Sequence, residues 1–205
     1  MLLYKAIIWL RKKVIIFITK IYVLIIFKVF SIKHYSDYKI YGLPIIKVGN
    51  KGSLSIGHKF KMNSGYYFNQ IGRQQKSILI ANGDLIIKDR VGISSTAIIC
   101  QKRIEIGNDV KIGGNTVIYD TDFHSLNFYI RRNFSDDVLN ANSSEVKVED
   151  DVFIGAHSII LKGVTIGKST IIAAGSVVSK SIPPFEIWGG NPAKFIKKVD
   201  NISES

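Results

Sequence analysis

The sequence predicts an all-β domain in which the chain coils into a three-sided column of short parallel strands. A period of six residues, in phase over 36 residues, is the first observation, and it fits neither a helix (3.6 residues) nor an ordinary strand (2 residues). The second observation is the choice of residues at the corners. The fifth hexad position is small or β-branched, and Gly or Ala often follows the first position, because tight corners need such residues. The hexads begin at Val148, Ile154, Ile160, Ile166, Ile172 and Val178.

Two earlier tracts carry the same period. One begins hexads at Ile106, Ile112 and Ile118, and the other, offset by one residue, at Ile87, Ile93 and Ile99. Three hexads per turn would close a triangular coil, and coils would stack about 4.8 Å apart. We expect the coiled domain to span residues 45–198, starting loosely near Ile45, with a loop at 124–145 where the period is lost and a tail at 199–205.

Residues 1–44 form a separate basic segment, predicted as an amphipathic helix followed by a connector. The net charge is +12, and seven Lys or Arg residues precede the first acid, Asp37. Between these cations the sequence is strongly apolar, and neither Gly nor Pro occurs before Gly42, which favours a helix.

Several roles remain open for this helix. It could lie on an anionic membrane leaflet through residues 1–33, or pack on the column or on a partner subunit. A membrane-spanning helix fits less well, because the longest uncharged run is only Ile21–Phe27. A cleaved signal peptide would need a small-residue cleavage site. Nucleic-acid binding is not expected, since no motif for it accompanies the charge. The single cysteine, Cys100, excludes an intramolecular disulfide.

The hexads, the segment Asp120–His124 (DTDFH) and the segment Gly190–Lys194 (GNPAK) together resemble the hexapeptide-repeat acyltransferases. The resemblance is to the branch containing galactoside and maltose acetyltransferases and surface-polysaccharide O-acetyltransferases. It implies a left-handed parallel β-helix, a homotrimer with active sites between subunits, acetyl-CoA as donor and a saccharide as acceptor.

The resemblance also implies that His124, at the root of the loop, is the catalytic base. Imidazole can take the proton of a sugar hydroxyl near neutral pH. Asp122 is the favoured residue to orient the imidazole, and Asp120 could do this or bind a sugar hydroxyl, although either could simply cap a turn. Candidates to contact the acceptor or the oxyanion are Ser94, Ser95 and Asn115, and the candidates to bind a diphosphate are Arg131 and Arg132.

For the donor, the resemblance places Ala156 and Ala174 along the pantetheine arm, with His157 beside it. Ser179 and Lys180 match the pair that meets the nucleotide end, and the remaining positions near the nucleotide are Asn191, Lys194 and Lys197. Trp188 is expected to cap the column, and Phe195–Val199 to begin a short helix or an extended tail. No metal is expected, because the histidine spacing does not fit a three-histidine zinc site.

The function predicted from these residues is acetyl-CoA-dependent O-acetylation of a bacterial surface polysaccharide or its precursor, in the cytoplasm at the inner face of the membrane. The alternative is N-acetylation of a nucleotide-linked amino sugar. A third interpretation is a non-catalytic scaffold.

Overall fold

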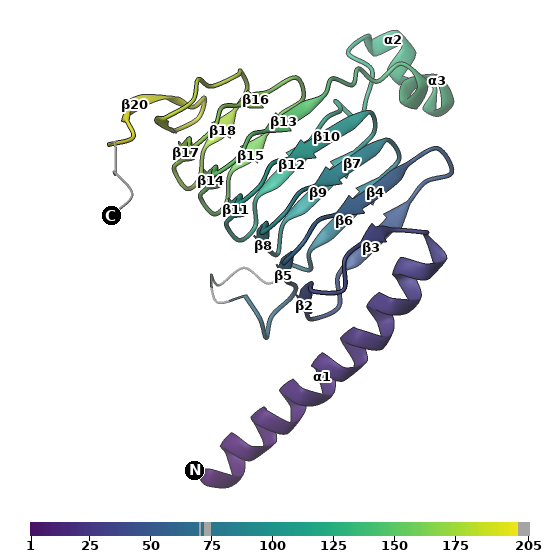
Figure 1. Cartoon of the computed structure of the whole chain (residues 1–205). Helices are drawn as coiled ribbons and strands as arrows, with labels where there is room; N and C mark the ends of the chain where they lie inside the picture. The colour runs from purple at the N-terminus through teal and green to yellow at the C-terminus, as the bar shows by residue number, and fades with distance from the viewer. Residues whose placement is uncertain (70, 72–74, 201–205) are drawn as a thin grey trace.

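The described residues of the computed structural model, 1–69, 71 and 75–200, form a three-sided prism of parallel strands with a long N-terminal helix at one end (Figure 1). The predicted fold class, a left-handed parallel β-helix, is confirmed. Consecutive strands pass from one sheet to the next, so that three strands complete one coil. Six coils stack along the prism and a β-hairpin closes its far end.

The three sheets share one pattern as far as β18, in which each strand pairs in parallel with the strand three positions along the chain; β19 then pairs in parallel with β17. Sheet A contains β1 (Lys33–His34), β4 (Ser53–Ile56), β7 (Asp84–Ile87), β10 (Arg103–Ile106), β13 (Val146–Val148) and β16 (Thr165–Ile166). Sheet B contains β2 (Lys39–Tyr41), β5 (Lys61–Asn63), β8 (Gly92–Ser94), β11 (Lys111–Ile112), β14 (Phe153–Ile154), β17 (Ile171–Ile172), β19 (Glu186–Gly189) and the antiparallel β20 (Lys194–Lys198). Sheet C contains β3 (Ile45–Val48), β6 (Ile78–Ala81), β9 (Ala97–Cys100), β12 (Val117–Tyr119), β15 (Ile159–Ile160) and β18 (Val177–Val178).

The aliphatic residues that open the hexads form three ladders inside the prism. In sheet C, for example, Ile118 pairs with Ile160, which pairs with Val178, and all three are buried. The fifth hexad positions of residues 148–183 are also buried: Val152, Ser158, Val164, Thr170, Ser176 and Ile182. The period of six therefore exists because one aliphatic side chain per strand must reach the same apolar column.

The hexad prediction is wrong at Ile99. Ile98 and Cys100 are the fully buried residues of β9, and Ile98 is the one that pairs with Ile118. The corner that precedes β9 is one residue shorter than the corner that precedes β12, so the ladder position moves back by one residue.

The prism also begins earlier than the expected boundary near Ile45. β1 and β2 complete its first coil, pairing with β4 and β5, and Ile40 is buried in line with Met62. The six-residue spacing from Ile40 to Ile46 was the available signal, but the polar turns on either side concealed it.

Both ends of the prism are capped. Helix α1 (Leu2–Val29) covers the first coil with Val23 and Phe27, and Trp188 closes the last coil by pairing with Ile172. Residues 194–198 form a strand, so of the two structures predicted for the end of the chain, a short helix or an extended tail, the extended one is confirmed. Residues 201–205 of the predicted tail lie outside the described residues. In the part of the chain that the structure describes, no helix combines the length and the apolar content that crossing a bilayer needs.

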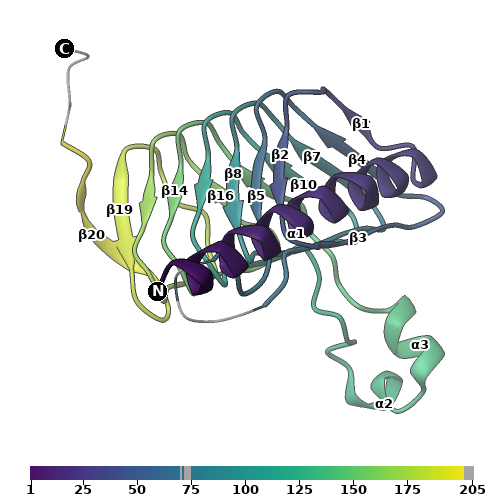
Figure 2. The same cartoon turned by 90° about the horizontal axis from the view of Figure 1, so that it is seen from below.

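The predicted loop at residues 124–145 contains two short helices, α2 (Phe128–Arg131) and α3 (Phe134–Leu139). Each begins at an asparagine whose side chain accepts backbone N–H bonds, Asn127 at α2 and Asn133 at α3, as N-caps do. We call residues 120–145 the excursion; it projects from the side of the prism (Figures 1 and 2). Strands β10 and β13 pair directly across it, so the ladders continue uninterrupted.

Cys100 is fully buried in β9, and this burial raises the pKa of its thiol to about 12. Because the thiolate is the reactive form, we expect iodoacetamide at pH 8 to leave Cys100 unmodified in the folded protein and to alkylate it after denaturation. Mass spectrometry of the intact protein measures this. Rapid alkylation without denaturant would contradict the buried position.

Candidate active site

His124 and Asp137 form the one side-chain pair of the excursion that has the geometry of a general base and its orienting carboxylate. His124 Nδ1 lies 2.7 Å from Asp137 Oδ2. The Asp137 side chain is 6% exposed, whereas that of His124 is 66% exposed. One imidazole nitrogen is therefore held by a covered carboxylate while the ring remains open to solvent.

The hydrogen bonds of Asp137 determine which nitrogen of His124 is the base. The imidazole of His124 beside Asp137, followed by the backbone N–H of Ser125 (2.6 Å), holds the pKa of Asp137 below its usual range. An ionised carboxylate only accepts hydrogen bonds, so Nδ1 must carry the proton that it donates. Nε2 of His124 is then left with its lone pair free to accept a proton.

The carboxylate that orients His124 is therefore that of Asp137. The sequence favours Asp122 for this role, and that prediction is wrong. Asp122 instead lies 3.4 Å from Lys162 Nζ. Asp137 was missed because it follows His124 by 13 residues, with two helices between. The available signal was the capping residue Asn133, which predicts a helix start and so a turn that could return Asp137 to the loop root.

Asp120 has a structural position rather than the predicted substrate-binding one. Its buried carboxylate accepts three backbone N–H bonds from the preceding coil: Gln101 (2.7 Å), Lys102 (2.7 Å) and Arg103 (2.9 Å). Next to it, Thr121 and Ser143 form an antiparallel bridge across the root of the excursion. Asp120 thus fixes the corner from which the excursion leaves the prism.

A second group of polar residues follows the corner between sheets B and C. Ser95, Asn115 and His157 lie there on successive coils, each with a positive φ. Asn115 Nδ2 lies 3.4 Å from His157 Nδ1. Among the described residues, Ser95 Oγ and Asn115 Oδ1 are buried without a hydrogen-bond partner. Ser94, at the end of β8, accepts a bond from Asn63.

These two groups lie at opposite edges of sheet C within one chain. Asn115 comes before β12, whereas the excursion that carries His124 follows β12. Both belong to the same coil, so they are at the same height along the prism. A single chain does not bring His124 together with Ser95 and Asn115.

The predicted donor residues divide between the same two edges. Ala156 and Ala174 lie at the B–C corner. The turn that contains Asn191 and leads to Lys194 lies beside them, because the N–H of Val177 donates to the carbonyl of Gly190 and the N–H of Ala193 donates to the carbonyl of Val177. Ser179 and Lys180 follow β18 at the other edge, and Lys180 Nζ lies 5.3 Å from the ring of Trp188. Lys197 is 3.2 Å from Asp200.

The two arginines of the excursion are differently engaged. Arg131 Nη1 donates to the carbonyl of Ser125 (2.8 Å), which ties α2 to the loop root. Arg132 is exposed and lies over the rings of Phe128 and Tyr129, at 5.6 and 5.3 Å. The side chain of Arg132 is therefore exposed where it could contact a diphosphate, as predicted, whereas that of Arg131 also holds the loop together.

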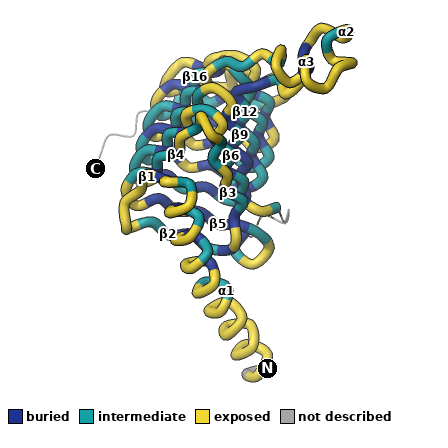
Figure 3. The backbone as a smooth tube through the Cα atoms, turned by 90° about the vertical axis from the view of Figure 1, so that its right-hand side faces the viewer, coloured by how far each residue is buried: buried dark blue, intermediate teal, exposed yellow. Residues whose placement is uncertain are grey.

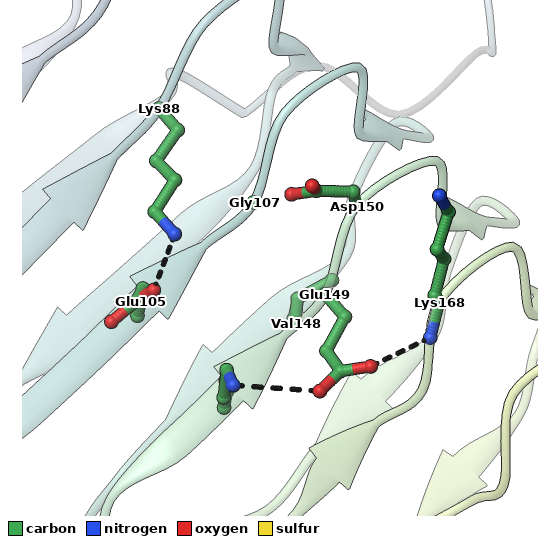
Figure 4. Close-up of a pocket in the computed structure, with 8 residues that line it drawn as sticks. Lys88, Glu105, Gly107, Val148, Glu149, Asp150 and Lys168 are labelled. Atoms are coloured by element: carbon green, nitrogen blue, oxygen red, sulfur yellow. Dashed lines mark hydrogen bonds and ion pairs between the residues drawn. The ribbon is translucent and has the colours of Figure 1, made fainter.

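A pocket of about 180 Å³ on sheet A, shown in Figure 4, is a charged surface rather than a site. Lys88 pairs with Glu105 (2.7 Å), and Glu149 accepts a bond from Lys168 N–H (2.9 Å) and pairs with Lys147. These charges already satisfy one another. Elsewhere in the described residues, no cluster of three His, Cys, Asp or Glu side chains could hold a metal ion.

Comparison with known proteins identifies the repeats. Residues 145–180 match the model of the bacterial transferase hexapeptide family (six repeats). The putative acetyltransferase C18B11.09c of Schizosaccharomyces pombe is 42% identical over 98 residues, which are 48% of this chain and 44% of that protein. The chain spans less than half the length of the curated relatives that it matches first.

Solved structures agree with this resemblance to the hexapeptide-repeat acyltransferases. A variant of AntD, an N-acyltransferase from Bacillus cereus, in complex with dTDP-4-amino-4,6-dideoxyglucose and coenzyme A, is 25% identical, with a TM-score of 0.56 over 80% of this chain and 79% of that one. AntD with dTDP and 3-hydroxybutyryl-CoA is 23% identical, with a TM-score of 0.64 over 83% and 85%.

Proposed function

We propose that this protein transfers the acetyl group of acetyl-CoA to a hydroxyl of a saccharide, with His124 as the general base. The observation that carries the proposal is the exposed imidazole whose Nδ1 is held by Asp137, because this leaves Nε2 ready to take the hydroxyl proton as the C–O bond forms. Attack on the thioester carbon places negative charge on the carbonyl oxygen, which needs a hydrogen-bond donor. When this intermediate collapses, the C–S bond breaks and the protonated His124 returns its proton to the leaving coenzyme A thiolate.

The donor would lie extended along the B–C corner. Asn115, Ala156, Ala174 and Asn191 occupy successive levels there, separated by three coil steps of about 4.8 Å each. Small side chains at Ala156 and Ala174 leave room for a narrow pantetheine arm, and Lys194 adds a positive charge near the hairpin end. The thioester would then lie near Asn115 and the nucleotide near Asn191.

We propose that the active site is completed in a homotrimer. Because His124 and Asn115 belong to the same coil, a threefold axis parallel to the prism would bring His124 of one copy opposite Asn115 of the next without a shift along the axis. Exposed apolar side chains on the excursion, among them Phe134 and Leu139, would be covered by such contacts. Light scattering should give three times the chain mass of 22.9 kDa.

Acceptor screening tests the proposed reaction. Purified protein with acetyl-CoA should release free thiol when a polysaccharide or lipid-linked oligosaccharide acceptor is added, and the product should gain one acetyl ester that mild alkali removes. An alkali-stable amide on a nucleotide-linked amino sugar would instead support N-acetylation. That second candidate is favoured by the AntD complex with an amino sugar and by the exposed guanidinium of Arg132. Release of no thiol with either acceptor class would count against both.

Asp137→Asn should lower kcat by about tenfold or more while leaving the KM for acetyl-CoA nearly unchanged. The amide can present an N–H where the carboxylate accepted one, which favours the tautomer with the proton on Nε2 and removes the base. Asp137 is a positioning residue in this scheme. Steady-state kinetics over a range of pH measure the effect, with Asp136→Asn, an exposed neighbour on α3, as the control. Equal kcat values for the two variants would exclude a role for the pair.

A further inference from the structure

Helix α1 carries two apolar stripes on opposite faces. The first faces the prism: Val23 and Phe27 are buried there, one turn apart, with Thr19 in line before them. At 100° per residue, the second stripe lies on the other side of the helix. Its members are 46–76% exposed: Leu3, Ile7, Leu10, Val14, Phe17, Ile18, Ile21, Leu24 and Ile25. Only the prism-facing stripe is used by the fold.

The outer stripe extends beyond the prism. The N-terminal half of α1 projects away from the coils (Figure 3), and its residues from Leu3 to Val14 are exposed, although Arg11 lies over the ring of Tyr67 at 4.5 Å and Lys12 over that of Phe68 at 5.8 Å. At about 1.5 Å per residue, the stripe from Leu3 to Ile25 is about 33 Å long. A monomeric surface seldom exposes an apolar strip of that size without a partner.

The charges on α1 indicate what the partner is. The helix contains six Lys or Arg residues and no acid. Lys13 and Lys20 border the outer stripe on one side and Arg11 borders it on the other. The α1 helix of a second copy is a poor electrostatic match, because it carries the same six cations and no acid.

A groove beside the helix has the same chemistry. It measures about 560 Å³ and is lined by Val23, Leu24 and Ile40 together with Lys20 and Lys39. Apolar walls combined with two cations suit an amphiphile whose head is anionic.

We propose that α1 docks on an anionic lipid bilayer, lying along the surface with its outer stripe in the acyl region and the bordering cations Lys13, Lys20 and Arg11 at the headgroups. Lysine stems bordering an apolar face can reach outward to headgroup phosphates while the stripe stays buried in lipid. The prism is then tethered through its first coil, where Val23 and Phe27 anchor the helix. The proposal concerns the helix alone and stands whether or not the protein transfers acetyl groups.

Vesicle flotation with the full-length protein, without acetyl-CoA, tests the proposal. Vesicles that contain phosphatidylglycerol should carry the protein upward at least tenfold more efficiently than vesicles of phosphatidylcholine alone. Lys13→Gln with Lys20→Gln should weaken the partition by on the order of 25-fold, since each surface cation contributes roughly a factor of five. The matched control removes two exposed prism lysines, Lys51→Gln with Lys102→Gln, and should bind nearly as wild type.

The stripe is tested separately by Leu10→Ser with Phe17→Ser, which should reduce flotation at least tenfold. Phe185→Ser, at an apolar residue just before β19 that is 48% exposed, is the control and should float as wild type. Circular dichroism and light scattering verify that the variants keep their fold and native mass. Three outcomes would overturn the proposal: wild type that fails to float, stripe variants that float fully, or stripe variants that change the native mass instead.

Discussion

Replacing His124 by alanine should lower kcat/KM for acetyl transfer by about 10²- to 10⁴-fold while leaving the protein folded. The loss arises because His124 is the exposed base at the root of the excursion, whereas the neighbouring carboxylates of Asp122 and Asp137 are largely covered. His124 is mostly exposed, and its partner Asp137 keeps the N–H of Ser125 after the substitution. We therefore expect the melting temperature to stay within about 2 °C of wild type.

Thiol release from acetyl-CoA with a reactive acceptor measures the effect, and calorimetric titration with coenzyme A separates binding from chemistry. Coenzyme A should bind the variant with nearly unchanged affinity, because the imidazole acts on the acceptor. His58→Ala is the matched control, since that histidine is stacked on Tyr35 in the first turns of the prism. Full activity in His124→Ala protein would refute the mechanism.

Replacing Asp120 by alanine should destabilise the fold by about 3 kcal/mol or more, because three backbone N–H groups lose their acceptor in a buried corner. In a chain of this size such a loss lowers the melting temperature by roughly 6–12 °C. Activity should fall as well, since Asp120 fixes the corner from which the excursion departs.

Thermal unfolding followed by circular dichroism measures this loss. Asp84→Ala is the control: Asp84 is exposed and accepts one bond from the hydroxyl of Ser53, so its removal should cost no more than about 1 kcal/mol. An Asp120→Ala protein that melts like the control would show that the corner does not depend on its carboxylate.

The coiled architecture could be predicted because its period is a direct consequence of packing. Each strand must send one aliphatic side chain into the same column, as Ile118, Ile160 and Val178 do, and a corner of fixed length repeats that demand every six residues. Where corner lengths change, the prediction failed. The hexad pattern predicts Ile99 as the inward residue, whereas Ile98 is, and it predicts a connector where the first coil lies.

The candidate site was only partly predictable. His124 could be identified from its motif and from the loss of period behind it. Its partner Asp137 could not, because the contact depends on how α2 and α3 fold back, and short helices leave no periodic signal. Asp120 lies in the same motif as His124, but its three backbone contacts come from a neighbouring coil, and the motif does not reveal them.

Because β10 pairs directly with β13, changes in the sequence of the excursion are separated from changes in the ladders of the prism. Ile104 lies opposite Val146 although about 40 residues of chain intervene, so the ladder is indifferent to what the excursion contains or how long it is. Excursion residues proposed to meet the acceptor can therefore diversify, provided that the loop root, His124 and its partner Asp137 are kept. Under the proposed reaction, a lineage built on this prism could acquire new sugars to modify while the proposed thioester groove at the B–C corner stayed the same.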